Sequence, residues 1–255
     1  MEFGDYSNLA ENYGKYRQGY SESLLSALLS LIDKPSCQID AVDVGAGTGI
    51  WTRMVAARGL ASITAIEPND SMRAVGEGQS GSLGITWLSG SGEKVPLDDA
   101  CCDMVSMASS FHWVDFDRGI KEFHRLLRPG GRFVALWNPR LPVTEPLLQD
   151  IEAYLGRLKP DLQRRSSGLS GISDQLSAKL DESHFFTDVV YVEGRHRVAF
   201  KKTDYMGVWR SVNDIQVQLG EQKFKDFICY LDDIIDDDQI IEQTYLTRAW
   251  SSRKI

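Results

Sequence analysis

The sequence lacks the features that mark several specialised classes of protein. Only four of its 255 residues are cysteines, and their positions show neither metal-site nor disulfide spacing. No apolar run approaches the ~20 residues that cross a bilayer, and no basic region followed by an apolar stretch stands near the amino terminus. We therefore expect a cytoplasmic protein with reduced thiols that binds neither a metal ion nor a membrane.

Positive charge is scarce as well. The chain carries 28 Lys and Arg against 36 Asp and Glu, which gives a net charge of −8. Proteins that bind nucleic acid need Lys and Arg to replace the counterions of the phosphates, so we expect no nucleic-acid partner. A hydrophobic share of 42% with 25% charged residues is typical of an ordinary globular protein, and the length allows one large domain.

Short apolar runs alternate with helical patterns over the first half of the chain. Helical patterns cover residues 21–32, 49–58 and 116–127, each between two apolar runs or before one. This alternation predicts a parallel α/β sheet with right-handed crossovers. The expected strands are Ile39–Val44, Ala61–Ile66, Ile85–Leu88, Asp103–Ala108 and Arg132–Trp137.

The pattern changes after Trp137. Residues 141–182 and 203–239 are predicted to be mainly helical, with short strands at Val189–Val192, His196–Phe200 and Thr244–Trp250. We expect one domain in three parts. These are a cofactor-binding core (1–138), a mainly helical lid that holds the acceptor (139–218), and a carboxyl-terminal helix and strand that close the sheet (219–255).

A glycine-rich turn and one acidic residue point to a ligand. Asp43–Gly49 reads DVGAGTG and lies between a predicted strand and a helix, where glycine lets a ligand approach the backbone N–H groups. Glu67 ends the next strand, where a carboxylate can bind both hydroxyls of a ribose. The glycines are spaced two apart, unlike the GxGxxG of dinucleotide sites. The two features predict a nucleoside-containing ligand; the alternative is a tight turn beside a surface glutamate.

Five segments in this order resemble the motifs of class I S-adenosylmethionine-dependent methyltransferases, in the small-molecule branch that includes trans-aconitate methyltransferase-like proteins. They are AVDVGAGTG (41–49), AIEPNDSM (65–72), SGSGEKVPLDDACCDMV (89–105), SSFHWVD (109–115) and FHRLLRPGGRFVALW (123–137). The resemblance implies a Rossmann-like sheet of about seven strands, mostly parallel with the last strand antiparallel, helices on both faces, and a helical lid.

The resemblance also implies a binding site for S-adenosylmethionine, whose product is S-adenosylhomocysteine. The glycine loop would hold the methionine part, Glu67 the ribose and Met72 the adenine, while Arg17 would meet the cofactor carboxylate. Ser91 stands where the family usually has an acid for the adenine amino group. The full set of expected cofactor contacts is Tyr13, Arg17, Asp43, Gly45, Ala46, Gly47, Glu67, Pro68, Met72, Ser91, Gly92, Glu93 and Ser109.

Other residues are candidates for the methyl acceptor. His112 could take a proton from the acceptor, because imidazole titrates near neutral pH, or it could only shape the pocket. Trp113 could form the wall of the acceptor pocket or pack locally, and Arg210 could pair with an acidic acceptor or form a surface ion pair. The expected acceptor contacts are His112, Trp113, Trp137, Trp209 and Arg210.

The sequence therefore predicts an enzyme that moves a methyl group from S-adenosylmethionine to an oxygen, nitrogen or carbon atom of a small molecule by in-line displacement. We expect a monomer or a homodimer. Two alternatives remain open at this point. One is a non-catalytic S-adenosylmethionine-binding or scaffold protein of the same fold, and the other is a nicotinamide-dependent oxidoreductase.

Overall fold

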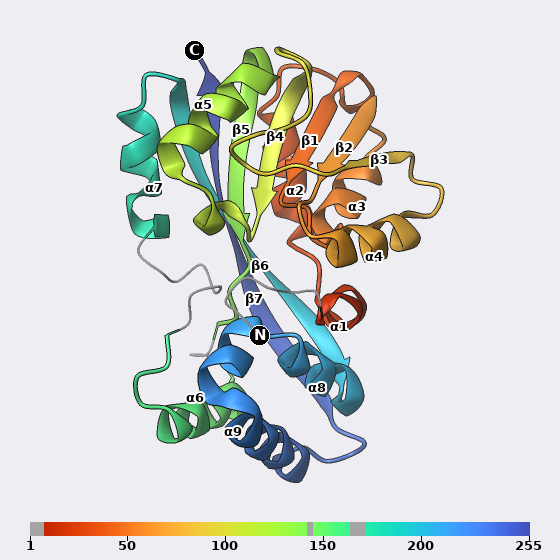
Figure 1. Cartoon of the computed structure of the whole chain (residues 1–255), viewed down its shortest axis with the longest axis vertical. Coiled ribbons are helices and arrows are strands. Elements are labelled where there is room, and N and C mark those ends of the chain that lie inside the picture. The colour runs from red at the N-terminus through yellow and green to blue at the C-terminus, as the bar shows by residue number, and fades with distance from the viewer. Residues whose placement is uncertain (1–7, 142–144, 164–171) are drawn as a thin grey trace.

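The computed structural model of the chain describes residues 8–141, 145–163 and 172–255. Figure 1 shows an elongated molecule with a sheet lobe at one end and a smaller helical lobe at the other. Two long strands, β6 (Phe186–Lys201) and β7 (Ile240–Lys254), run from the first lobe into the second. Residues 142–144 and 164–171 of the predicted mainly helical segment 141–182 lie outside the described residues.

The sheet has seven strands in the order β3-β2-β1-β4-β5-β7-β6. Strand β7 pairs antiparallel with both β5 and β6, and the other pairings are parallel. This confirms the predicted Rossmann-like, mostly parallel sheet with an antiparallel last strand. The remaining strands are β1 (Asp40–Val44), β2 (Ser62–Ile66), β3 (Ile85–Leu88), β4 (Cys102–Ala108) and β5 (Leu127–Trp137).

Helices cover both faces of the sheet, as expected. Leucines and isoleucines at helical spacing bury α2 against one face, where α3 also packs. Helices α5 and α7 cover the other face, and α5 begins at Asp115, whose side chain accepts a hydrogen bond from the Arg118 N–H. These helices and their neighbours are α2 (Glu22–Ser30), the short 3₁₀ turn Ser36–Gln38, α3 (Ile50–Ala56), α4 (Asp70–Ser80), α5 (Phe116–Leu126) and α7 (Ile172–Asp181).

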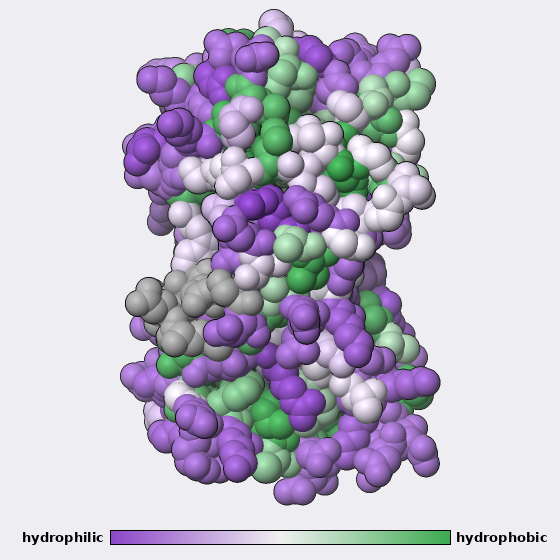
Figure 2. Space-filling model, turned by 45° about the vertical axis from the view of Figure 1, so that its right-hand side comes forward, coloured by the Kyte–Doolittle hydropathy of each residue, from purple (hydrophilic) through white to green (hydrophobic). Residues whose placement is uncertain are grey.

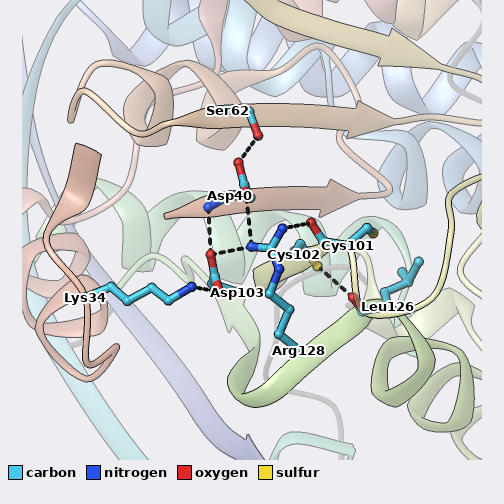
Figure 3. A network of polar contacts seen from close by, with 8 residues as sticks. All are labelled: Lys34, Asp40, Ser62, Cys101, Cys102, Asp103, Leu126 and Arg128. Carbon is cyan, nitrogen blue, oxygen red and sulfur yellow. Dashed lines mark hydrogen bonds and ion pairs between the residues drawn. The ribbon is translucent and has the colours of Figure 1, made fainter. Parts of the chain in front are cut away.

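A polar network ties together the strand ends that lie away from the glycine loop. Arg128 donates hydrogen bonds to Asp40 and Asp103, each at 2.8 Å, and Lys34 donates to Asp103 at 2.6 Å. Figure 3 shows these groups converging from the starts of β1, β4 and β5. Arg128 also donates to the backbone oxygen of Cys101. The network fixes this edge of the sheet and leaves the opposite edge to the glycine loop.

The helical lobe has a core of its own, built from α6 (Pro146–Leu158), α8 (Lys202–Arg210), α9 (Asn213–Ile234) and the ends of β6 and β7. Helix α7, which the sequence placed in the same lid segment, packs on the sheet instead. The expected boundary at residue 218 falls inside α9, which leaves helical geometry at Gly220. The division into a cofactor-binding core, a lid and a carboxyl-terminal part stays a prediction.

One strand replaces the two short strands expected between residues 189 and 200. Strand β6 continues through Gly194, because β7 pairs with it along almost its whole length. A Cβ atom at Gly194 would lie 2.7 Å from the Ser21 hydroxyl oxygen. Glycine here marks the close approach of the amino-terminal segment to the sheet, and not a break in the strand.

Candidate functional site

A pocket of about 400 Å³ opens at the carboxyl ends of β1, β2 and β4, the edge where ligands lie in open α/β sheets. It brings together eleven of the thirteen residues expected to contact the cofactor, and Trp113 of the expected acceptor set. These lining residues are Tyr13, Gly45, Ala46, Gly47, Glu67, Pro68, Met72, Ser91, Gly92, Glu93, Ser109 and Trp113. Arg17 and Asp43 lie outside the lining.

The glycine loop forms one side of this pocket. Gly45 and Gly47 have φ values of 65° and 59°, a region that side chains other than glycine rarely adopt. A Cβ atom at Gly45 would lie 2.8 Å from the Ser110 side chain. The N–H groups of Gly45 and Ala46 both donate to the Ile66 oxygen. These hydrogen bonds attach the loop to the end of strand β2.

Glu67 faces the loop from the end of β2. Its carboxylate accepts hydrogen bonds from the Gly47 N–H at 2.7 Å and the Asn69 N–H at 2.8 Å. Burial raises the pKa of Glu67, and these two backbone donors oppose the increase. Each carboxylate oxygen has a second lone pair, so the group can join the loop and still accept hydrogen bonds from a diol in the pocket.

Asp43 lies near the end of strand β1, beneath the loop, and does not line the pocket. Its carboxylate accepts hydrogen bonds from the hydroxyls of Thr52 at 2.6 Å and Ser106 at 3.0 Å. Burial raises its pKa to about 7, although both hydroxyls oppose the rise. The structure thus places Asp43 where it supports the loop from behind. Direct contact of Asp43 with the cofactor stays a prediction.

The pocket wall after β3 is formed by Ser91, Gly92 and Glu93. Ser91 and Lys94 exchange backbone hydrogen bonds, which closes a tight turn. Gly92 is required by contact, because a Cβ atom there would lie 2.4 Å from a methyl group of Val114. Glu93 accepts a hydrogen bond from the Asp115 N–H at 3.1 Å. This turn therefore connects the pocket to the start of α5.

The amino-terminal segment borders the pocket through helix α1 (Ala10–Tyr16) and Tyr20. The Tyr20 hydroxyl lies 3.0 Å from the Ser109 hydroxyl, and burial raises the pKa of Tyr20, so it stays a neutral phenol. Arg17 instead donates to Ser211 of the helical lobe. Sequence reasoning did not identify Tyr20, because only the folded chain brings it to Ser109.

Ser109 ends β4 with a φ of 55°, which is uncommon for a residue other than glycine. Its N–H donates to the Leu136 oxygen at 2.7 Å, which fixes it at the mouth of the pocket. Thr48, Trp51, Asn69 and Ser110 also line the pocket near the loop, and the motifs did not indicate them. Each stands in the sequence close to a residue that the motifs did indicate.

His112 follows β4 in a 3₁₀ turn (Phe111–Trp113). Its Nδ1 accepts a hydrogen bond from the Trp137 indole N–H at 3.3 Å. Burial lowers the pKa of His112 to about 4, and Asp214 partly opposes this change. An indole N–H can only donate, so the neutral ring carries its proton on Nε2. His112 therefore presents a donor at Nε2, whereas a general base needs a free lone pair there.

Trp209 and Arg210 are not brought to this pocket. The Trp209 side chain is fully buried in the helical lobe, with the guanidinium carbon of Arg140 4.1 Å from its ring centre. Arg210 is exposed on α8. Their expected contact with an acceptor stays a prediction, and in this conformation Trp209 can act on a ligand only through its neighbours.

Within residues 8–141, 145–163 and 172–255, no group of three or more His, Cys, Asp or Glu side chains could hold a metal ion. The helices of the described chain include none that is both long and apolar enough to cross a membrane.

Comparison with known proteins finds similarity over part of the sheet lobe. Residues 42–135 match the methyltransferase domain family. An uncharacterized methyltransferase of Mycobacterium tuberculosis is 38% identical over 129 residues, which are 50% of this chain and 49% of the relative. A ubiquinone/menaquinone biosynthesis C-methyltransferase of Caulobacter vibrioides is 32% identical over 132 residues, 48% of this chain and 52% of that protein. The chain thus spans about half the length of these curated relatives.

Solved structures resemble the whole fold. One methyltransferase-fold structure from Anaeromyxobacter dehalogenans has a TM-score of 0.67 at 19% identity and covers 93% of this chain and 98% of its own. A geranyl diphosphate C-methyltransferase from Streptomyces coelicolor has a TM-score of 0.51 at 16% identity, with 98% of each chain covered. At this identity the likeness concerns the fold alone. Residues 42–135 thus match the methyltransferase domain family, and the solved structures share the Rossmann-like fold of the chain.

Proposed function

We propose that the protein transfers a methyl group from S-adenosylmethionine to an oxygen, nitrogen or carbon atom of a small molecule. One observation carries this proposal. The carboxylate of Glu67 and the glycine loop meet in one pocket, joined by the 2.7 Å hydrogen bond from the Gly47 N–H. A ribose hydroxyl pair fits the carboxylate, and a chain of atoms without steric hindrance fits the loop.

The residues present fit this cofactor. A side chain at Gly45 would fill the space between the loop and Ser110, and Met72 supplies an apolar surface beside Glu67. Glu67 would hold the ribose, Met72 and Pro68 would pack on the adenine, and Ser91 would meet its amino group. When bound, S-adenosylmethionine supplies an activated methyl group on a sulfonium.

The protein has to orient the acceptor and exclude water, because the methyl donor is already activated. Tyr13, Tyr20 and Trp113 border the open side of the pocket, and their aromatic faces can stabilise a nearby cation. His112 would donate its Nε2–H to the acceptor and so position it. The proton of the attacking group would then leave to another base or to water. The helical lobe would complete the acceptor site, in a protein that works as a monomer or homodimer in the cytoplasm.

Calorimetry with S-adenosylmethionine, S-adenosylhomocysteine and NAD tests the proposal. We expect both methionine-derived ligands to bind and NAD to fail, because the GxGxG spacing differs from the pyrophosphate fingerprint. Transfer of a radiolabelled methyl group to an extract of small molecules then tests turnover. Binding of NAD in place of S-adenosylmethionine would favour an oxidoreductase, and binding without any transfer would favour a non-catalytic protein.

A further inference from the structure

Three polar side chains form a row across the strands that join the two lobes. Arg140, just beyond the end of β5, forms a β-bridge with Tyr245 of β7, and Tyr245 stands opposite His196 of β6. Directly opposed residues share a face of the sheet, so the three side chains lie side by side on it. The rings of His196 and Tyr245 are stacked, with centres 5.6 Å apart. We call Arg140, Tyr245 and His196 the polar row.

Each member of the row keeps a buried polar atom without a hydrogen-bond partner. These atoms are Arg140 Nη1, the Tyr245 hydroxyl and His196 Nδ1, judged against the described part of the chain. The His196 Nε2 is engaged, since it donates to the Gly19 oxygen at 3.1 Å. Buried polar groups in native proteins are almost always hydrogen-bonded. Arg140 Nη1 and the Tyr245 hydroxyl can donate to a bound group, whereas His196 Nδ1, with the ring proton on Nε2, can only accept.

The charge of Arg140 also lacks a counterpart. A guanidinium stays protonated at any physiological pH, and no ion pair joins Arg140 to an acid within residues 8–141, 145–163 and 172–255. Burial lowers the pKa of Arg140, but Tyr245, Tyr205 and, least, the Glu152 carboxylate outweigh this effect, so the pKa is raised overall. The ring of Trp209 covers one face of the guanidinium, which leaves its edge for hydrogen bonds. Buried charges are normally paired, so we expect an anion to bind beside Arg140.

The row lies within reach of the cofactor pocket. Leu136 accepts a hydrogen bond from Ser109 of the pocket, and Arg140 is four residues further along the chain, at most about 14 Å away. The Asn138 side chain donates to the Gly19 oxygen, and the Tyr20 hydroxyl contacts the Ser109 hydroxyl. Gly19, beside the row, and Tyr20, in the pocket, are therefore adjacent in the chain. Figure 2 shows that the molecule is narrower between its two lobes.

We propose that Arg140 and Tyr245 of the polar row bind a compact oxyanion, a carboxylate or a phosphate, and that this group belongs to the methyl acceptor. Arg140 would supply the charge and the first hydrogen bond, and the Tyr245 hydroxyl the second. The proposal rests on the proposed function, because it assigns the chemistry of the acceptor. It also explains why Trp209 is buried against Arg140: the indole positions the guanidinium and does not itself touch the acceptor.

A binding experiment tests the row directly. Calorimetry on the S-adenosylhomocysteine-saturated protein would use inorganic phosphate, succinate and, as a neutral counterpart, succinamide. We expect at least one anion to bind, succinamide to fail, and binding to weaken at least about tenfold in Arg140→Gln, which loses a charge-assisted hydrogen bond. Tyr245→Phe, which removes one hydroxyl, should weaken it less. Arg195→Gln is the matched control, because Arg195 is exposed on β6 beside His196.

The outcomes of this experiment distinguish failure of the anion site from failure of the proposed function. If neither anion binds, or if Arg140→Gln binds them as tightly as the wild type, the row is no anion site. If Arg140→Gln does not fold, Tyr245→Phe alone decides, and unchanged anion binding there overturns the proposal. If S-adenosylhomocysteine fails to bind while an anion binds, the proposed function is wrong and the anion site stands.

A transfer experiment then identifies the source of the anion. Radiolabelled methyl transfer would be measured on a set of carboxylic acids, phosphate esters and the corresponding amides. We expect acids or phosphates to be methylated in preference to amides, and Arg140→Gln to lose that preference while S-adenosylmethionine affinity is kept. Equal methylation of amides, or anion binding that leaves transfer unaffected, would show that the row holds a free anion and not the acceptor.

Discussion

The sheet lobe and the helical lobe depend on different kinds of residue. One side of the pocket in the sheet lobe is a loop in which three glycines have positive φ. The helical lobe is held by aromatic packing, as in the pair Tyr154 and Tyr230, whose rings stack with centres 3.8 Å apart. A loop that a ligand approaches closely needs residues without side chains, whereas a small lobe needs large apolar side chains to bury enough surface. Local motifs can therefore report the first lobe and not the second.

The two lobes meet through polar contacts. Arg17 donates to Ser211, and Gly19 accepts hydrogen bonds from Asn138 and His196. Strands β6 and β7 pass through both lobes without interruption. Because the strands are continuous, we expect the lobes to unfold together, although binding of the cofactor depends on only one of them. The following variants test this division.

The largest effect is expected at the glycine loop. Gly45→Val places a Cβ atom 2.8 Å from the Ser110 side chain and forces valine to a φ of 65°, so S-adenosylmethionine binding should be lost in calorimetry. Gly59→Ala is the control, because Gly59 also has a positive φ but nothing lies within 4 Å of its Cβ position. Retained affinity in a folded Gly45→Val protein would show that the loop does not contact the cofactor.

Trp209→Ala tests the other lobe. It removes a fully buried indole that packs against Phe227 with ring centres 5.3 Å apart, which should lower the free energy of unfolding by about 3–5 kcal/mol. Arg210→Ala, one residue away and exposed, should change it by less than about 0.5 kcal/mol. Urea unfolding measures both. S-adenosylmethionine affinity should remain in each variant, and a parallel loss of affinity in Trp209→Ala would refute the independence of the pocket.

Asp43 should make stability depend on pH. Its pKa is about 7 in the folded protein against an ordinary 3.8, so the folded state retains a proton that the unfolded chain releases. The stabilisation is complete below pH ~4 and is lost as the pH rises to about 7, which corresponds to at most about 4 kcal/mol.

The comparison of wild type with Asp43→Asn isolates this contribution. Urea unfolding at several pH values should show the wild type losing stability relative to Asp43→Asn between pH 4 and pH 8. Asp98→Asn, a change of an exposed carboxyl group, should track the wild type. A constant difference between wild type and Asp43→Asn would mean that Asp43 titrates like an exposed acid.

Glu67→Gln should have the smallest effect of the four. It keeps the shape of the side chain but removes the charge that would hold the ribose hydroxyls, so the dissociation constant for S-adenosylmethionine should rise about 10–100-fold. Glu77→Gln, on the exposed side of α4, serves as the control. If calorimetry gives the same affinity for Glu67→Gln and wild type, the carboxylate serves only to join the loop to Asn69.

Much of the cofactor side could be predicted from the sequence, because its signals are local. The run from Asp43 to Gly49 and the acid at Glu67 are short patterns between a strand and a helix, and strand order in such sheets follows from right-handed crossovers. The pocket lining contains eleven of the thirteen expected residues. The two short strands expected near Gly194 were wrong, because long pairing with β7 overrides the local preference of glycine.

The sequence by itself thus indicated the parallel strands and most of the residues at their carboxyl edge, since these depend on chain order and on the spacing of neighbours, while the antiparallel last strand was implied by the family resemblance. Tertiary structure decided what depends on distant contacts. It turned Arg17 toward Ser211, buried Trp209, and fixed the proton of His112 on Nε2 through Trp137. It also aligned Arg140, Tyr245 and His196 across three strands. Register between strands more than forty residues apart is set by the packed sheet, so no local pattern in the chain records it.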